Sequence, residues 1–181
     1  MKSPSTLEQL KSILALPFMV IVVIPIAINY LTSDLEFNPI YDLNQSVIYV
    51  FGILFLLLGV PLFIQSIILF VKIGKGTLAP WNPTKKLVVK GLYRHMRNPM
   101  IFGVYIILFA ESFLFKSPTI LVWSFTFLLL NHLYFILKEE RDLLKRFGEE
   151  YQEYMENVPR WIPRIKGWKP ETNKTRLLNK R

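Results

Sequence analysis

PMIFGVYIILFAESFLFKSPTILVWSFTFLLLNHLYFIL, residues 99–137, holds two apolar runs separated only by Lys116 and Ser117. The runs cover 99–115 and 118–137, and each has about the 17–25 residues that an α-helix needs to cross a bilayer. A link of two residues forces the two helices to lie antiparallel and side by side. This stretch therefore predicts a hairpin of membrane-spanning helices.

Two further apolar runs precede the hairpin, at 13–31 and 46–71. The 181 residues are 52% hydrophobic, which is unusual for a soluble domain. The first run is too long for the core of a signal peptide and lacks a small-residue cleavage site, so we expect a retained span. The sequence predicts an all-α membrane protein with four transmembrane helices in a single membrane-embedded domain, residues 1–181.

The charges of the chain, net +9, are distributed unevenly around these runs. Lys and Arg gather at 72–98 and again after 137, whereas the link at 32–45 has acidic residues and no Lys or Arg. The positive-inside rule then places both termini and the 72–98 segment in the cytoplasm. Such charge favours contact with lipid headgroups rather than nucleic acid. We expect an integral protein of a prokaryotic plasma (inner) membrane.

The helical pattern continues beyond residue 137, out of the predicted membrane. Apolar residues recur there at steps of three and four, at Leu143, Leu144, Phe147, Tyr151 and Tyr154. This predicts a C-terminal amphipathic helix on the cytoplasmic face of the bundle. The prolines of the 158–168 segment should end it, with Trp161 and Trp168 at the membrane interface.

Several kinds of chemistry are excluded by composition. There is no cysteine, so disulfides, thiolate zinc sites and cysteine nucleophiles are absent. His95 and His132 are the only histidines and lack metal-ligand spacing, so we expect no metal. Residues 74–79, GKGTLA, fit a dinucleotide-binding pattern, but they follow a membrane helix instead of a strand.

The stretch GLYRHMRNPMIFG, residues 91–103, crowds Arg94, His95 and Arg97 against the start of the third run. Asn98 is a favoured N-cap and Pro99 a favoured first helical residue, so the helix should begin there. A helix N-terminus carries free N–H groups and partial positive charge, which suit an anion. The stretch predicts an anion pocket where the cytosol meets the bilayer, although a helix cap alone also explains Asn-Pro.

His132, Phe135 and Glu139 lie at i, i+3 and i+7 and so share one face of the last predicted span. That face would present an imidazole, an aromatic ring and a carboxylate at successive depths. The alternative for Glu139-Glu140 is a solvated helix exit, and we expect Glu140 to be a surface charge. His132 is either a proton acceptor or a packed, hydrogen-bonded histidine.

An ordered set of motifs in residues 72–168 resembles the integral-membrane methyltransferases, which include isoprenylcysteine carboxyl methyltransferase and the phospholipid N-methyltransferases. The set is Gly91-x-Tyr93-x-x-x-Arg97-x-Pro99-x-x-x-Gly103, then Glu139-Glu140, Phe147-Gly148-x-x-Tyr151-x-x-Tyr154 and Val158-Pro159. The first two spans are similar only as hydrophobic segments. The resemblance implies S-adenosylmethionine bound at the cytoplasmic end of the last two spans, within about 74–103 and 132–168.

The resemblance also implies individual residues. The cofactor contacts of the family fall on Lys85, Lys86, Leu87, Val88, Tyr93, Arg97, Asn98, Pro99, Met100, Ile101 and Glu139. Asn98 stands where the family usually has His, and Ile101 where it has Tyr. Phe135 stands where the prenylcysteine enzymes carry a substrate-contacting Arg, so a prenylcysteine carboxylate would lose its partner here.

These observations predict transfer of a methyl group from S-adenosylmethionine to a lipophilic or membrane-associated small acceptor at the cytoplasmic face. The candidate catalytic residues are His132 and Glu139, and Phe135 is the candidate substrate-binding residue. An amine acceptor must shed a proton, which His132 could take. Two alternatives stand: a nicotinamide-dependent membrane reductase of similar helical design, and a non-enzymatic membrane accessory protein.

Overall fold

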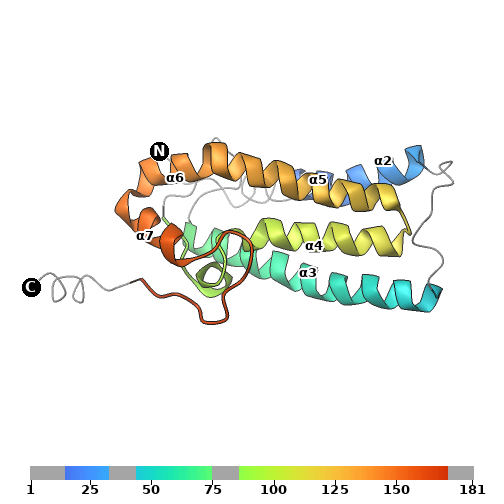
Figure 1. Cartoon of the computed structure of the whole chain (residues 1–181), viewed down its shortest axis with the longest axis horizontal. Coiled ribbons are helices and arrows are strands. Elements are labelled where there is room, and N and C mark those ends of the chain that lie inside the picture. The colour runs from blue at the N-terminus through green and yellow to red at the C-terminus, as the bar shows by residue number, and fades with distance from the viewer. Residues whose placement is uncertain (1–14, 33–43, 75–85, 171–181) are drawn as a thin grey trace, which may run out of the picture.

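The computed structural model describes residues 15–32, 44–74 and 86–170, and the regular secondary structure in these ranges is entirely helical (Figure 1). The elements are η1 (Met19–Val23), α2 (Ile24–Leu31), α3 (Gln45–Gly74), η2 (Gly91–Arg94), α4 (Pro99–Leu114), α5 (Pro118–Tyr134), η3 (Phe135–Glu139), α6 (Glu140–Phe147) and α7 (Glu149–Asn157). The elements η1 and η3 are π-helical turns that continue into their α-helical neighbours, and η2 is a 3₁₀ turn.

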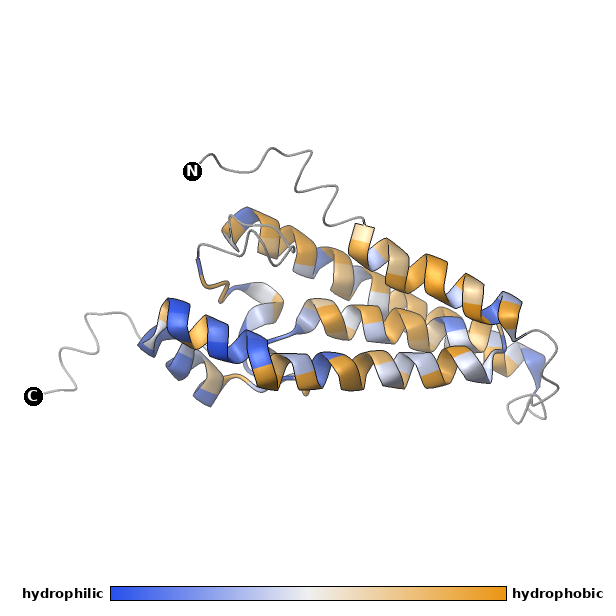
Figure 2. Cartoon of the chain, turned by 90° about the horizontal axis from the view of Figure 1, so that it is seen from above, coloured by the Kyte–Doolittle hydropathy of each residue, from blue (hydrophilic) through white to orange (hydrophobic). Residues whose placement is uncertain are grey.

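Four apolar helices correspond to the four predicted runs. Two of them, Gln45–Gly74 and Pro118–Phe147, are long and apolar enough to cross a membrane, while Ala15–Leu31 and Pro99–Leu114 are apolar but shorter. Figure 2 shows apolar residues along the bundle and hydrophilic residues at the end that carries α6 and α7. The all-helical membrane architecture agrees with the sequence. Crossing by all four helices and the cytoplasmic position of the termini remain predictions.

The backbones of α3 and α4 approach closely because glycine occupies the contact on both helices. A Cβ atom on Gly103 would lie 2.8 Å from the backbone nitrogen of Phe63, and one on Gly59 would lie 3.0 Å from the backbone nitrogen of Ile107. Small residues of this kind let membrane helices pack without a gap. The contact sets the position of α4 along α3. It therefore also sets the position of Arg97, which lies just before the first residue of α4.

The short link predicted between the third and fourth runs is present. Ser117 precedes α5 and accepts a hydrogen bond from the backbone nitrogen of Ile120 at 3.3 Å, and Pro118 opens the helix. The paired helices share a core in which Val104, Leu108 and Phe127 are buried. Because this hairpin is tight, the start of α4 and the end of α5 lie at the same end of the bundle (Figure 1).

The C-terminal amphipathic helix is two helices instead of one. The chain adopts φ +54° at Gly148, a left-handed conformation that side-chain-bearing residues rarely take, and this separates α6 from α7. The turn lets Tyr151 and Tyr154 fold back and become buried together with Val158. The prediction of one continuous helix was wrong, because glycine ends a helix even where the apolar spacing continues.

Residues 158–168, which we call the C-terminal strap, run back along the segment that precedes α4 (Figure 1). The backbone N–H of Arg97 donates to the Pro159 carbonyl at 2.9 Å, and those of Arg164 and Trp168 donate to the carbonyls of His95 and Arg94 at 3.0 and 2.9 Å. The predicted interfacial tryptophans pack on protein: Trp168 on Tyr154 and Trp161 on Phe135. The strap thereby closes one side of the polar end of the bundle.

Candidate functional site

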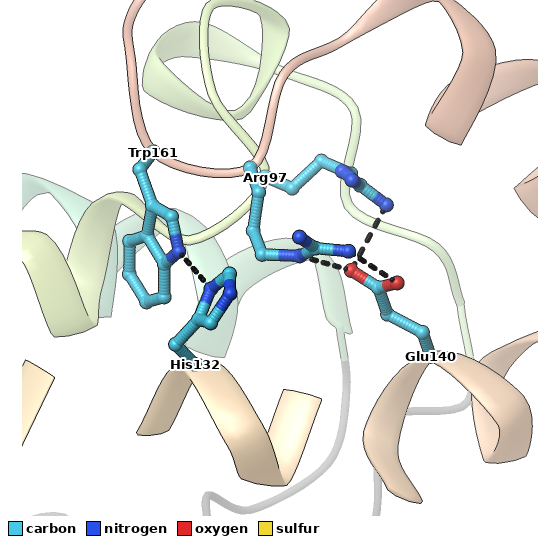
Figure 3. A network of polar contacts seen from close by, with 5 residues as sticks. Arg97, His132, Glu140 and Trp161 are labelled. Carbon is cyan, nitrogen blue, oxygen red and sulfur yellow. Dashed lines mark hydrogen bonds and ion pairs between the residues drawn. The ribbon is translucent and has the colours of Figure 1, made fainter. Parts of the chain in front are cut away.

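A buried ionic cluster joins the start of α4, the start of α6 and the strap (Figure 3). Arg160 donates two hydrogen bonds to the Glu140 carboxylate, from Nε to Oε1 at 2.7 Å and from Nη2 to Oε2 at 2.9 Å. Nη1 of Arg97 lies 3.1 Å from the same Oε1. The Glu140 side chain is 13% exposed and that of Arg97 is 10% exposed. Glu140 is therefore an organising anion, and the expectation of a surface charge was wrong.

The Arg97 guanidinium retains unused hydrogen-bonding capacity. Its contact with Glu140 is close enough for an ion pair but lacks hydrogen-bond geometry, and Nε and Nη1 are buried with no hydrogen-bond partner in the described chain. A buried N–H group without a partner costs about 1–3 kcal/mol, and more when charged. The Nε–H group of Arg97 can therefore still donate to one further acceptor.

Glu139 differs from Glu140 because its carboxylate is not paired with an arginine side chain in the described chain. Its side chain makes no hydrogen bond or ion pair within the described residues, although it is half-buried. Burial raises the pKa of Glu139 to about 7; Arg146 opposes the shift, and Glu140 and Asp142 add to it. Because Arg146 acts on this half-buried carboxylate by its charge but makes no ion pair with it, the carboxylate can still pair with a cationic group.

The charge of Glu139 contributes to the pKa shifts of Tyr93 and Tyr151. Burial, followed by the charge of Glu139, raises the pKa of Tyr93. Burial also raises the pKa of Tyr151 to about 12, with Glu140 adding to the shift and Arg97 opposing it by charge and hydrogen bond. Both phenols therefore stay neutral at physiological pH and can serve only as hydrogen-bonding or packing groups.

Phe135 and His132 are brought together by a residue of the strap. The Trp161 ring lies 5.7 Å from the ring of Phe135 and 6.3 Å from that of His132, between centroids. Trp161 Nε1–H donates to His132 Nδ1 at 2.9 Å (Figure 3). Because indole is only a donor, neutral His132 carries its proton on Nε2. Proton acceptance by His132 would therefore require the Trp161 bond to open.

The π-turn η3 explains why Glu140 joins the site. In a π-helix the residues at i and i+5 stand in register, instead of i and i+4. Phe135 therefore aligns with Glu140, one residue beyond the Glu139 that regular α-helical geometry selects. The sequence has no proline or glycine at this position that would signal the change of register.

The cationic stretch before α4 does not converge as predicted. Of its three basic or imidazole side chains only Arg97 reaches the ionic cluster, since Arg94 Nε donates to the Trp168 carbonyl at 2.6 Å and His95 Nδ1 pairs with the Arg164 carbonyl at 2.8 Å. Both of these side chains hold the strap. The expected single pocket for all three was wrong, because the strap supplies carbonyl acceptors that the sequence pattern does not reveal.

The start of α4 follows the prediction in part. Pro99 opens the helix and is fully buried, but Asn98 has φ −122° and ψ 54° and its side chain makes no capping bond. A residue outside the extended region does not aim its side chain at the helix N-terminus. Met100 is half-buried, and Ile101 packs on the core of α4 and α5.

The other described residues implied by resemblance make no hydrogen bond or ion pair with the Glu140 carboxylate. Tyr93 is buried, and its hydroxyl donates to the Ser66 carbonyl of α3 at 3.5 Å while its own carbonyl accepts from the Tyr154 hydroxyl at 2.6 Å. Val88 is buried and Leu87 packs beside Tyr154, whereas Lys86 is exposed. Lys85 lies outside the described residues.

Sequence reasoning missed three contributors to the site: Glu140 as an anchor, and Arg160 and Trp161 from the strap. The motif Val158-Pro159 marked the position of the strap but not its contacts. Within residues 15–32, 44–74 and 86–170 no three His, Asp or Glu side chains gather where they could hold a metal ion. At the polar end of the bundle, Arg97 pairs with Glu140, Trp161 packs on Phe135, and the Glu139 carboxylate makes no ion pair among the described residues.

Comparison with known proteins gives this arrangement a family. Residues 47–150, more than half of the chain, match the phospholipid methyltransferase family. The chain belongs to this family. It is also 32% identical over 77 residues to "Methanethiol S-methyltransferase 2" of Bradyrhizobium diazoefficiens. That alignment covers 41% of this chain and 27% of the relative, so the chain spans about a quarter of the relative's length.

Proposed function

We propose that this protein transfers a methyl group from S-adenosylmethionine to a lipophilic or membrane-associated small acceptor. Membership of the phospholipid methyltransferase family supports methyl transfer over a nicotinamide-dependent reductase or a non-enzymatic accessory role. The name of the relative from Bradyrhizobium diazoefficiens, a methanethiol S-methyltransferase, supports the same reaction class. S-adenosylmethionine supplies a methyl group on a sulfonium and needs positioning more than acid–base machinery.

One observation carries the proposal. The Arg97 guanidinium has a buried N–H group without a hydrogen-bond partner, and the Glu139 carboxylate makes no hydrogen bond or ion pair, among the described residues. The amino-acid end of S-adenosylmethionine is a zwitterion, with a carboxylate that would satisfy the buried Nε of Arg97. Its ammonium would suit the Glu139 carboxylate, which lacks a partner among the described residues. A cation and an anion left open at one end of the bundle fit a zwitterion better than they fit a purely anionic nucleotide.

The chain's own groups then act in two ways: they hold the cofactor in position and they exclude water. Glu140 and Arg160 fix Arg97, and the strap covers the side on which Trp161 meets Phe135. In the transfer, a lone pair of the acceptor forms the bond to the methyl carbon as the carbon–sulfur bond breaks, and the sulfur keeps that electron pair. A thiol or amine acceptor must also lose one proton, and His132 could take it only after its hydrogen bond with Trp161 opens.

The acceptor we propose is small and weakly polar. Phe135 meets the aromatic rings of Tyr134 and Trp161. Such a wall suits an apolar or thiol-bearing molecule and disfavours a carboxylate. The apolar helices around it provide a path by which a lipid-soluble acceptor reaches the site from the bilayer.

Binding of S-adenosylhomocysteine to the purified, detergent-solubilised protein tests the proposal, with NADPH titrated in parallel. Glu139→Gln keeps the shape of the side chain but removes its charge, and should weaken S-adenosylhomocysteine binding by about tenfold or more, as expected for a charge-assisted hydrogen bond. Glu150→Gln, at an exposed position of α7, is the matched control and should leave affinity within about twofold. Binding of NADPH without S-adenosylhomocysteine would refute the proposal.

We further propose that the site faces the cytoplasm of a prokaryotic cell, on the charge asymmetry of the sequence. Single cysteines introduced at Asn38 and Thr175 should react with a membrane-impermeant maleimide from opposite sides, Asn38 from outside. Labelling of both from the same side would overturn the four-span topology without touching the cofactor proposal.

A further inference from the structure

An open cavity lies between the C-terminal half of α3 and the segment that precedes α4. It has a volume of about 610 Å³ and is lined by Gln65, Ile68 and Leu69 of α3 and by Leu92, Arg94 and His95 at η2. Gly91 and Gly167 complete its wall. Figure 1 shows the neighbouring elements, with the strap passing around η2 beside the C-terminal part of α3. None of its lining residues belongs to the ionic cluster or to the aromatic wall of Phe135.

Two glycines stand where the backbone approaches its neighbours most closely around the cavity. Gly91 has φ +55°, and a Cβ atom there would lie 2.6 Å from Cδ1 of Leu69. A Cβ atom on Gly167 would lie 3.0 Å from Nε2 of His95. The two glycines let η2 and the strap approach α3 and His95 closely, and so shape the cavity.

Three polar side chains meet this cavity with unused hydrogen-bonding capacity. Arg94 is oriented by its Nε bond to the Trp168 carbonyl, and its two terminal amino groups have no partner among the described residues. His95 uses Nδ1 for the Arg164 carbonyl, which leaves Nε2 unused. The Gln65 amide makes no hydrogen bond within the described chain.

Gln65 is the most informative of the three because of where it lies. It is exposed on α3, within the run predicted to cross the membrane, and a polar amide facing hydrocarbon without a partner is unfavourable. At 1.5 Å per residue it lies about 14 Å along the helix from Gly74, and Leu69 lies about 7 Å from that end. The cavity therefore extends from the helix end towards the apolar part of the bundle.

We propose that this cavity binds an acidic membrane lipid. Its phosphate would lie at Arg94, and the part of an acyl chain nearest the headgroup would lie along Ile68, Leu69 and Leu92. The cation and the amide supply donors for phosphate oxygens, and none of the described residues that line the cavity is acidic. The apolar side chains suit an acyl chain instead of a soluble anion, and Ile68 is exposed at the side that would meet the bilayer. The site is separate from the Arg97 and Glu139 groups on which the proposed methyl transfer depends.

Binding of dihexanoyl phosphatidylglycerol to the protein in neutral detergent, measured by isothermal titration, tests the proposal. Dihexanoyl phosphatidylcholine and glycerol phosphate serve as the zwitterionic and head-only probes. Arg94→Gln should weaken binding of the acidic lipid by about tenfold or more. Lys90→Gln removes the same charge from an exposed neighbouring position and should leave it within about twofold.

Two further variants keep the test decisive if Arg94→Gln loosens the strap. Gln65→Leu breaks no described bond and should weaken binding about threefold or more, and Ile68→Trp should fill the cavity and abolish binding. Equal effects of Arg94→Gln and Lys90→Gln would show general attraction to a basic surface and overturn the site. Glycerol phosphate binding as tightly as the lipid would overturn the lipid assignment. Competition between S-adenosylhomocysteine and the lipid would assign the cavity to the cofactor and overturn the lipid site. If S-adenosylhomocysteine binds nowhere on the protein, only the proposed methyl transfer is refuted.

Discussion

Glu140→Gln should destabilise the protein, because it removes the anion between two guanidinium groups. In the folded chain Glu140 accepts both hydrogen bonds of Arg160 and lies 3.1 Å from Arg97 Nη1. Glutamine retains one carbonyl acceptor, but its amide N–H₂ then faces a donor. Arg97, whose Nε already lacks a hydrogen-bond partner among the described residues, would also lose the carboxylate that pairs with its Nη1.

The size of the effect follows from burial. Removing one partner of a fully buried pair costs about 3–5 kcal/mol, and exposed pairs contribute about 0–1 kcal/mol. The side chains of Glu140, Arg97 and Arg160 are 13%, 10% and 24% exposed, which places this cluster nearer the buried limit. We expect a loss of about 2–3 kcal/mol in the free energy of unfolding. For a chain of this size that corresponds to a fall of roughly 4–12 °C in the midpoint of thermal unfolding.

Thermal unfolding of the detergent-solubilised variants, followed by tryptophan fluorescence, measures this effect. Glu150→Gln is the control for loss of an exposed carboxylate and should shift the midpoint by less than about 2 °C. A double-mutant cycle of Glu140→Gln with Arg160→Gln should give a coupling energy of about 1 kcal/mol or more. If Glu140→Gln unfolds at the same temperature as the parent, the ionic cluster does not hold the site together.

Three further predictions concern pH, packing and the acceptor. The folded chain keeps a proton on Glu139 between its ordinary pKa of 4.5 and about 7, so the stability of the ligand-free protein should fall as pH rises through that window, and Glu139→Gln should remove this slope in thermal unfolding. Gly103→Ala, whose Cβ would lie 2.8 Å from the Phe63 nitrogen, should cost about 1–3 kcal/mol, and an unchanged unfolding midpoint would contradict the close contact of α3 and α4. A farnesylcysteine analogue should be methylated poorly even when S-adenosylhomocysteine binds, because Phe135 is covered by Trp161, and robust turnover in a radiolabelled methyl-transfer assay would refute this reading.

The helices were predictable because their signals are local. Uncharged runs of sufficient length, a link of two residues between the last two and the proline that opens α4 fixed the existence and order of the apolar helices within the described chain. The motif around Arg97 and Glu139 gave the family, which the match over residues 47–150 shows. These features depend on side chains close in sequence, so periodicity and spacing report them.

The partners of the site residues were decided only by tertiary structure. A single π-turn, η3, puts Glu140 in register with Phe135, and helical-wheel geometry does not anticipate that extra residue. The strap contacts Arg94 and His95 across 74 and 69 residues of sequence, and it contacts Glu140 and His132 across 20 and 29 residues, so all of these are contacts between distant segments. The sequence by itself determined which groups are available at the polar end of the bundle. Folding determined which of them meet, because contacts between distant segments depend on helix register and chain return, and no local pattern encodes either.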